Sequence, residues 1–281
     1  MRIEFTKMHG IGNDYIYVNC MEKELENPSD IAVKMSKRRF SVGADGLVMI
    51  CKSNVADAKM RMFNADGSEG KMCGNATRCV GKYLYDNKIV DKTEITLETL
   101  SGIKYISLKV ENDIAISARV DMGIANFEPA AIPVISENPM INEPILINGR
   151  EYKITTVSVG NPHAVTFVDQ VDNIELEKIG PLFENNEIFP ERVNTEFVKI
   201  IDNKTLQMRV WERGSGETLA CGTGACAVAV AAIKNGHCNF NTEITVKLIG
   251  GDLKILIDSE YKIFMEGPAT KVYEGVYEYE N

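Results

Sequence analysis

The sequence predicts an α+β fold of two similar domains, each with a mixed sheet curled or closed into a barrel around a central helix. Three observations lead to this prediction. The chain repeats itself at a spacing of 148 residues, short β-type segments outnumber helical ones, and one helical segment is apolar on every face. A chain of 281 residues could form one large domain or two of about 140 residues, and the repeat favours two.

Three segments carry the repeat and align without a gap. They are "FNADGSEGKMCGNATRC" (63–79) with "WERGSGETLACGTGACA" (211–227), "GIGNDYIYV" (10–18) with "SVGNPHAVT" (158–166), and "GLVMI" (46–50) with the start of "NTEFVK" (194–199). Cys73 therefore corresponds to Cys221. Because separate segments share one spacing, we infer that the two halves arose by duplication.

Runs rich in Val, Ile, Thr and aromatic residues predict strands in both halves. They lie at 3–6, 15–19, 47–51, 59–63, 94–99, 103–110 and 114–120, and at 154–158, 164–168, 195–201, 205–211, 243–247, 252–257 and 262–266. Apolar residues at helical spacing predict an amphipathic helix from Cys73 to near Asn87. After Cys221, the all-apolar run 225–233 predicts one enclosed helix that closes at Asn235 and Gly236.

Four prolines in the segment 122–144 mark the expected boundary between the halves. We assign residues 1–120 to the N-terminal half and residues 121–266 to the C-terminal half. The final segment, 267–281, has no counterpart at the end of the first half and is expected to return to the N-terminal half.

Charge and composition exclude several classes of protein. A net charge of −9 with no clustered basic residues argues against a nucleic-acid partner. The longest apolar run is nine residues, too short to span a membrane, and the N-terminus lacks the apolar core of a secretion signal, so we expect a cytoplasmic protein. Seven cysteines, an odd number, favour reduced thiols over a disulfide framework.

Cys73 could be a buried thiol, a metal ligand, half of a disulfide or a reactive group. A helix start offers unpartnered N–H groups and partial positive charge, which can lower a thiol pKa and bind a carboxylate. Gly74 and Gly222 would leave these amides open to a ligand. Most single cysteines are small buried hydrophobes, and we interpret the remaining five in that way. Repetition at equivalent positions favours a reactive role for Cys73 and Cys221.

Two such thiols on opposite faces of one carbon could invert its stereochemistry. A thiolate would remove the proton beside a bound carboxylate while the opposite thiol donates one, and this chemistry requires no cofactor. A metal site is less well supported, because the cysteine spacings differ from those of zinc sites. The glycine-rich "RGSGE" and "CGTGA" could cradle phosphate, but neither nucleotide-binding glycine pattern is present.

At these residues the sequence resembles the diaminopimelate epimerases. The resemblance is carried by "NADGSEGKMCGNATR" (64–78), "GNPHAV" (160–165), "RVNTEF" (192–197) and "WERGSGETLACGTGA" (211–225), and "GIGNDY" (10–15) and "GADGL" (43–47) fit as well. It spans essentially the whole chain. It implies a pyridoxal-independent isomerase that converts LL- to meso-diaminopimelate, in lysine and peptidoglycan precursor biosynthesis, with its active site in the cleft between two similar domains.

The resemblance also implies residue roles, without a cofactor or a metal. Cys73 and Cys221 would be the catalytic acid/base pair, and His163 would be a possible auxiliary. The reacting carboxylate would be held by Gly74, Asn75, Gly222 and Thr223. The far amino acid end would be held by Asn13, Asn64, Asn161, Asn194, Glu212 and Arg213. The only partner expected besides this small-molecule substrate is a second copy of the chain, in a homodimer.

Two alternatives remain open at this point. A proline or hydroxyproline racemase would share the fold and two cysteines, but such enzymes typically carry His at the position of Asn75. A thiol-based binding or redox protein would hold a metal or a Cys73–Cys221 disulfide. One departure from the family pattern is Gly46, where some members carry a glutamine that contacts the substrate region.

Overall fold

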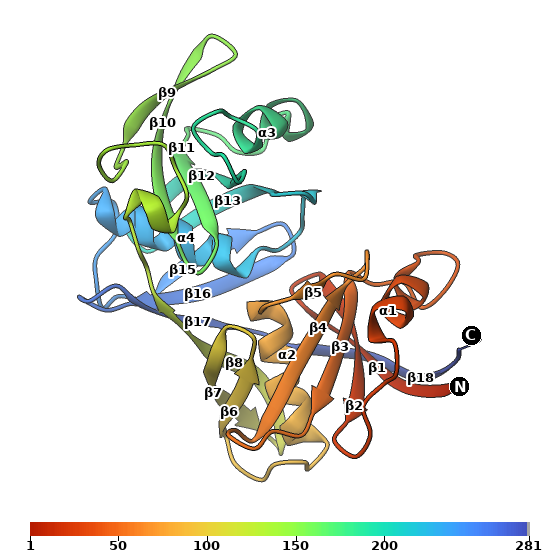
Figure 1. Ribbon diagram of the computed structural model, residues 1–281. Coiled ribbons are helices and arrows are strands. Elements are labelled where there is room, and N and C mark those ends of the chain that lie inside the picture. Colours follow the sequence, from red (N-terminus) through yellow and green to blue (C-terminus); the bar gives the residue numbers. More distant parts are fainter. Residues whose placement is uncertain (280–281) are drawn as a thin grey trace. The chain divides into compact units, whose positions relative to one another are not determined.

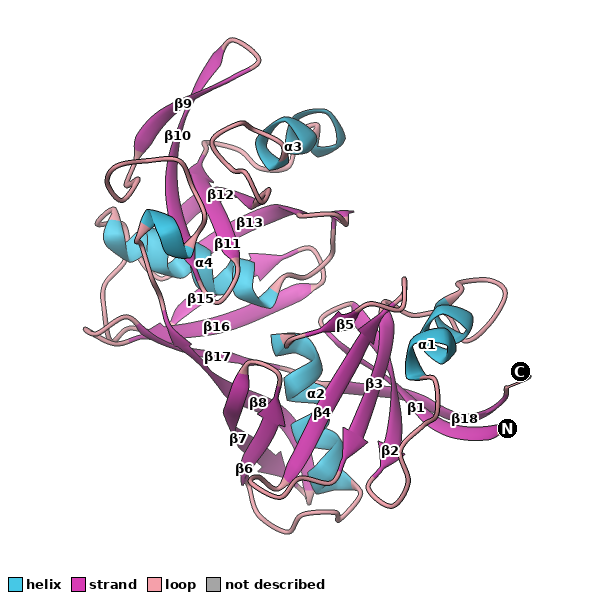
Figure 2. Ribbon diagram, viewed as in Figure 1, coloured by secondary structure: helices cyan, strands magenta, loops and turns pink. Residues whose placement is uncertain are grey.

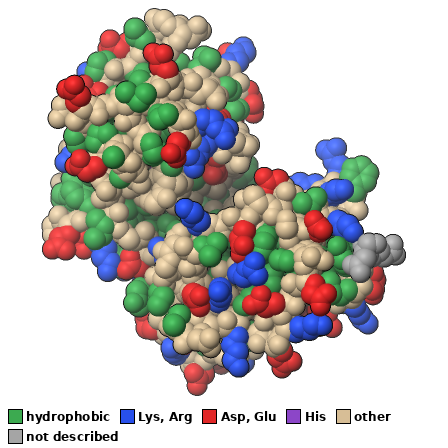
Figure 3. Space-filling model, viewed as in Figure 1, with side chains coloured by type: hydrophobic (Ala, Val, Ile, Leu, Met, Phe, Trp, Pro, Cys, Tyr) green, Lys and Arg blue, Asp and Glu red, His purple; other side chains and the backbone are tan. Residues whose placement is uncertain are grey.

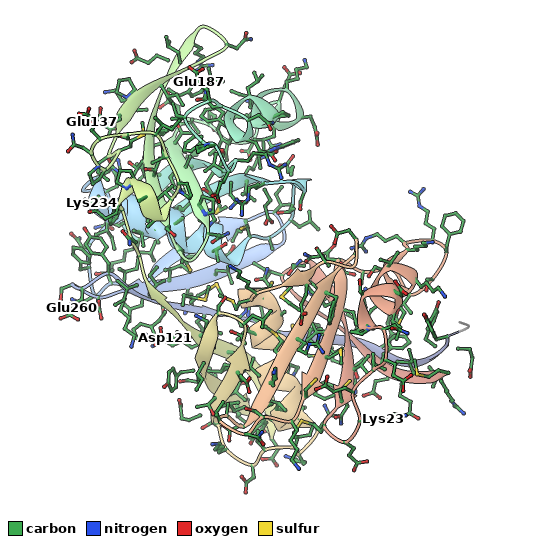
Figure 4. The ribbon with its side chains drawn as sticks, viewed as in Figure 1. Lys23, Asp121, Glu137, Glu187, Lys234 and Glu260 are labelled. Carbon is green, nitrogen blue, oxygen red and sulfur yellow. The ribbon has the colours of Figure 1, made fainter. Side chains whose placement is uncertain are left out.

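The computed structural model describes residues 1–279 and divides into two compact units (Figure 1). The first comprises Met1–Asp121 and the residues from Glu266 onward, and the second comprises Met122–Met265. Both boundaries fall inside strands, β8 (Ile114–Ile124) and β17 (Lys262–Gly267), each within a residue or two of the expected limit. Asp121, labelled in Figure 4, is the last residue of the first unit before the chain passes into the second.

The first unit is a mixed sheet in which the strands follow the order β18, β1, β2, β3, β4, β6, β7 and β8. The β2–β3 and β4–β6 pairs are parallel and the others antiparallel. The strands are β1 (Arg2–Gly10), β2 (Asn13–Cys20), β3 (Gly46–Cys51), β4 (Ala58–Asn64), β5 (Glu69–Gly70), β6 (Glu94–Thr99), β7 (Gly102–Glu111), β8 and β18 (Thr270–Glu278).

The helix α2 (Gly74–Asp86) is the core element of the first unit. It contacts β1 and β2 at one end of the strand order and β7 near the other, so the sheet curls around it. Figure 2 shows α2 against the strands of its own unit. A second helix, α1 (Pro28–Ser36), covers β3 and β4 and buries Ile31, Ala32 and Met35.

The second unit repeats this arrangement in the order β9, β10, β11, β12, β13, β15 and β16. The β11–β12 and β13–β15 pairs are parallel. The strands are β9 (Glu143–Ile147), β10 (Arg150–Ser158), β11 (Pro162–Phe167), β12 (Asn194–Asp202), β13 (Thr205–Glu212), β14 (Gly216–Glu217), β15 (Ile244–Leu248) and β16 (Gly251–Ile257), with β17 crossing the boundary.

The helix α4 (Gly222–Lys234) is enclosed by this sheet. It contacts β10, β11, β12, β13, β15 and β16, and its residues from Gly224 to Ile233 are all buried. An all-apolar helix is stable only when protein surrounds it, as the sequence predicted. At its last residue the Lys234 ammonium lies 5.0 Å from the ring centre of Phe127 and 5.6 Å from that of Tyr261 (Figure 4). Gly236 then adopts a left-handed conformation, φ 77°.

The structure confirms the duplicated α+β fold. The bounds of α2 and α4 differ by 148 residues at both ends, and the parallel registers Tyr15↔Gly46 and His163↔Asn194 differ by the same number. An ion pair also repeats at that spacing. Nε of an arginine lies 2.8 Å from a glutamate oxygen in Arg61–Glu69 and 2.7 Å away in Arg209–Glu217.

Each half has the expected central helix, but the sequence did not predict the outer helices α1 and α3 (Leu176–Glu184). Both are nine residues long and carry a proline, and short helices of this kind rely on tertiary packing. The prolines of 122–144 also do not exclude regular structure. Pro144 lies in β9, where its only recorded strand partner is Lys153 of β10, as an edge position permits.

Gly46 has a steric reason to lack a side chain. A Cβ there would lie 2.1 Å from the carbonyl oxygen of Phe63 and 2.8 Å from the ring of Tyr15. Since β2, β3 and β4 approach closely at this point, this packing excludes a glutamine side chain at position 46. Asn194, its counterpart in the second unit, keeps a side chain and begins β12.

Candidate active site

Cys73 and Cys221 each stand at the residue before a core helix. Cys73 (φ −136°, ψ 122°) and Cys221 (φ −119°, ψ 107°) are extended, and helical geometry begins at Gly74 and Gly222. The first N–H groups of each helix therefore lie next to a thiol, where they and the helix dipole favour an anion. Cys221 is buried and Cys73 is half-buried, and all seven cysteines are free thiols.

The same side-chain contact accompanies each cysteine. In the first unit, Asn75 Nδ2 donates to Asn13 Oδ1 across 3.3 Å. In the second, Asn161 Nδ2 donates to Thr223 Oγ1 across 3.2 Å. Both residues of one pair lie 148 positions after those of the other. In each unit, a side-chain hydrogen bond thus links the start of the core helix to the turn between two paired strands, β1 and β2 in the first unit and β10 and β11 in the second.

Around Cys73 the neighbouring groups are amides. Its Sγ lies 3.4 Å from Asn13 Oδ1, and Asn13 Nδ2 donates to Asp45 Oδ2 across 2.8 Å. Because Asp45 accepts only, it fixes the amide so that the oxygen faces the thiol. Arg78, fully buried in the first turns of α2, donates to Asn75 Oδ1 across 2.9 Å. A buried cation therefore lies at this helix start.

Around Cys221 the neighbouring groups include carboxylates. Its Sγ accepts from Gly224 N across 3.3 Å and lies 3.6 Å from Thr223 Oγ1. A Cβ on Gly224 would lie 3.1 Å from that Sγ and 2.8 Å from Glu196 Oε1, so only glycine leaves room for both groups. Glu212 also interacts with the thiol, and its carboxylate accepts a hydrogen bond from Thr218 Oγ1.

These surroundings keep Cys221 protonated. Burial raises the pKa of the thiol well above its ordinary value, and the negative charges of Glu212 and Glu196 raise it further, while Thr223 and Gly224 lower it. Burial likewise raises the pKa of Glu212. The expectation that a helix start lowers the thiol pKa is therefore wrong for Cys221, because desolvation outweighs the helix-start donors.

His163 and Glu196 form a fully buried pair beside this helix start. His163 Nδ1 lies 2.7 Å from Glu196 Oε1, and His163 Nε2 lies 3.0 Å from Asn161 Oδ1. Sequence reasoning placed His163 near the site but missed Glu196. The signal was present, since a glutamate stands in an otherwise uncharged strand start, "NTEFV".

The remaining predicted residues lie at the ends of strands. Asn64 ends β4, and its Nδ2 donates to Ser68 Oγ across 2.9 Å. Both ends of the Asn194 amide bind backbone, with Nδ2 donating to Pro162 O (2.8 Å) and Oδ1 accepting from Arg213 N (2.9 Å). The Arg213 guanidinium donates to Glu191 O across 2.8 Å and forms no ion pair within residues 1–279.

The predicted residues thus gather into one cluster in each unit. Asn13, Asn75 and Cys73 are in contact in the first, with Gly74 between the last two and Asn64 paired opposite Gly46. The second brings together Asn161, His163, Glu212, Cys221, Gly222 and Thr223, with Asn194 holding the backbone of Arg213.

Comparison with known proteins gives consistent results. The sequence profile of the family described as diaminopimelate epimerase matches residues 5–128 and 155–272. A diaminopimelate epimerase of Acetivibrio thermocellus is 56% identical over 97% of this chain and 98% of its own length. One of Methanococcus maripaludis is 54% identical, with 97% and 99% covered. The crystal structure of a probable proline racemase from Agrobacterium radiobacter shares the fold at a TM-score of 0.72 and 14% identity, with 99% and 93% covered.

The fold and the paired cysteine sites define a duplicated protein of the same architecture as the racemase-like structures. Because different families can share one architecture, sequence identity decides the family of this chain. On the profile match and the two relatives, this chain belongs to the diaminopimelate epimerase family.

Two further observations concern membrane-spanning helices and surface charge. Within the described residues, no helix combines the length and apolar character needed to cross a membrane. Acidic and basic side chains are interspersed on the face drawn in Figure 3.

The carboxylate next to Cys221 yields a first prediction. Replacing Glu212 by Gln removes a negative charge, so the thiol pKa should fall and alkylation of Cys221 by iodoacetamide at neutral pH should accelerate several-fold. Peptide mapping by mass spectrometry measures the rate at Cys221 alone. The control is Glu217→Gln, whose carboxylate pairs with Arg209 instead. An alkylation rate unchanged in the Glu212 variant would show that the Glu212 charge does not contribute to the raised pKa of Cys221.

Proposed function

We propose that the chain epimerises LL-diaminopimelate to meso-diaminopimelate by two-base catalysis, without a cofactor, with Cys73 and Cys221 as the acid/base pair. The observation that carries the proposal is the pair of thiols at equivalent helix starts, each beside the same Asn contact. Membership of the family supports the substrate. The resulting pathway would be lysine and peptidoglycan precursor biosynthesis, in the cytoplasm.

In the proposed reaction, one cysteine thiolate takes the proton from the carbon that carries the reacting carboxylate. The C–H electron pair stays on carbon and spreads into that carboxylate. The opposite cysteine donates its S–H proton to the other face of the carbon and becomes the thiolate. The proton count is conserved, the stereocentre is inverted, and the two thiols have exchanged roles. In the state described here, Cys221 is the protonated partner.

The helix starts would supply the electrostatic part of the catalysis. Charge grows on the carboxylate as the carbanion forms, and preorganised donors stabilise growing charge best in a dry site. We assign this role to the N–H groups at Gly74, Asn75, Gly222 and Thr223. Asn13 and Asn161 contact the side chains of Asn75 and Thr223, so they also hold these donors in place.

The far amino acid end of the substrate distinguishes this function from proline racemisation. We assign it to Asn13, Asn64, Asn161, Asn194, Glu212 and Arg213. The Arg213 guanidinium is bound only through one backbone contact, so its fork is available for a carboxylate. Proline has no second amino acid end for these groups to bind.

Loss of either thiol should abolish epimerisation. Cys73→Ala and Cys221→Ala each remove one of two proton-transferring groups, so kcat should fall by at least about 100-fold. The measurement is interconversion of the LL and meso isomers, with solvent deuterium entering the product. Cys238→Ala serves as a control, since that buried thiol lies after α4 rather than at a helix start.

Substrate choice decides between the two families. With wild-type protein in deuterated water, label should enter LL-diaminopimelate and not L-proline. Label in proline alone would contradict the proposed substrate. Normal turnover in either cysteine variant would contradict the two-base mechanism.

Arg213 should determine affinity for the far carboxylate. Arg213→Gln removes a charged hydrogen-bond partner worth about 1.5–3 kcal/mol, so kcat/KM should fall roughly 10- to 100-fold, mainly through KM. Steady-state kinetics with LL-diaminopimelate measure the effect. Arg150→Gln is the matched control, because this exposed arginine begins β10 and lies over Tyr152. Equal kinetics in the two variants would exclude Arg213 from the site.

We also propose a homodimer. Val272 and Val276 on β18 are 54% and 45% exposed, so this strand offers apolar side chains to a second copy. Light scattering should give about twice 31.2 kDa, and replacing both valines by Lys should lower the mass toward one chain. A wild-type mass near 31.2 kDa would refute the dimer.

A further inference from the structure

Glu196 is a buried carboxylate for which the proposed mechanism has no use. It lies on β12 at 0% exposure, and one of its oxygens, Oε1, is bound to His163. The other, Oε2, is buried and has no hydrogen-bond partner in the part of the chain that the structure describes. A buried charge with an unsatisfied oxygen is costly to the folded state. Such a group is retained where it does something that an apolar residue would not.

Glu196 begins a chain of hydrogen bonds that ends at Cys221. Asn161 Oδ1 can only accept, so His163 Nε2 donates to it across 3.0 Å. Asn161 Nδ2 then donates to Thr223 Oγ1 across 3.2 Å. Thr223 Oγ1 accepts that bond and keeps its own proton to donate, and Cys221 Sγ lies 3.6 Å away. After Glu196, each hydrogen bond has its donor on the His163 side and its acceptor on the Cys221 side. Consecutive bonds of this kind polarise and strengthen one another.

Glu196 also lies close to the thiol in space. Its Oε1 and Cys221 Sγ both lie within 3.1 Å of one point above Gly224. The charged and titratable groups facing Cys221 are therefore Glu196 on β12, Glu212 at the end of β13 and His163 on β11. Of these three residues, Glu196 is the one that the sequence analysis did not assign to the site.

The first unit has no such group at the equivalent position. Counting back 148 residues, Glu196 corresponds to Val48 and His163 to Tyr15. Val48 is fully buried in β3, so the fold itself is satisfied by an apolar residue at this place. Glu196 is thus a property of the Cys221 side and not a requirement of the duplicated fold.

We infer that Glu196 is a positioning residue for Cys221. Through His163 it fixes the Asn161–Thr223 pair that directs a hydrogen bond to the thiol. The inference rests on the proposed function for its effect on turnover, but not for its effect on the thiol.

Two substitutions test this orientation. In Glu196→Gln the amide donates to His163 Nδ1, so Nε2 keeps its proton and the chain to Cys221 persists. In Glu196→Leu nothing holds His163 Nδ1, so the chain is lost, while both variants lack the carboxylate. Glu217→Gln, which removes the carboxylate of the Arg209 ion pair, is the control. Alkylation of Cys221 by iodoacetamide is followed against pH by peptide mapping, and kcat and KM for LL-diaminopimelate are measured on the same samples.

We expect the alkylation profile of Cys221 to lie at higher pH in Glu196→Leu than in Glu196→Gln, because the Thr223 hydroxyl that lowers the thiol pKa is held in place only in the Gln variant. The kcat of Glu196→Gln should stay within about 10-fold of wild type. Glu196→Leu should show a further fall in kcat of about 10- to 100-fold, the usual effect of losing a group that orients a functional side chain, with little change in KM. Glu217→Gln should leave the profile and the kinetics unchanged.

Identical alkylation profiles in the Gln and Leu variants would overturn the inference. So would equal kcat values in the two, because orientation through His163 would then have no effect. If Glu196→Leu fails to fold, Glu196→Val, which carries the residue found at the equivalent position 48, takes its place in the same comparison. A shifted profile in a protein that does not turn over LL-diaminopimelate would contradict the proposed function and leave the link between Glu196 and Cys221 in place.

Discussion

The buried N-terminus of each core helix is the constraint on which the site depends. The first N–H groups of α2 and α4 have no partners within the helix, and burial denies them bulk water. The fold surrounds each helix with a curled sheet, so any group that satisfies these donors must come from adjacent turns or from a ligand. Cys221 accepts from Gly224, and the Asn13–Asn75 and Asn161–Thr223 contacts fix the neighbouring side chains. The same few residues therefore pack each helix start and line the place where an anion would bind.

Duplication supplied this arrangement twice, and the charges around it then diverged. The Arg61–Glu69 and Arg209–Glu217 pairs are the same in both units, as expected of groups that hold two neighbouring strands. At the helix starts the equivalent residues differ. The first unit has the buried cation Arg78 where the second has Cys226, and the second has Glu196 and Glu212 where the first has Val48 and Asn64. Similar backbones therefore place the two thiols near different charged groups.

Much of this was predictable because the repeat can be detected without structure. The spacing of Cys73 and Cys221 gave the duplicated fold, and the apolar run after Cys221 gave the enclosed helix with its end at Asn235. Short elements stabilised by tertiary packing, such as α1 and β9, carry no comparable local pattern and were missed. The raised pKa of Cys221 was also out of reach, because it depends on burial and on carboxylates from two other strands. The position of Cys221 at a helix start, taken alone, predicted a lowered pKa.

The asymmetry bears on how a two-base enzyme begins its cycle. An acid and a base of identical surroundings would share one proton equally, and half of the molecules would then hold the proton on the wrong side for a given isomer. The carboxylates of Glu212 and Glu196 remove that degeneracy on one side, because they raise the pKa of Cys221 and hold its proton. In the proposed mechanism the substrate carboxylate would add its charge beside both thiols. The preference set by Glu212 and Glu196 would then persist in the complex, and it resides in positions at which the two halves no longer match.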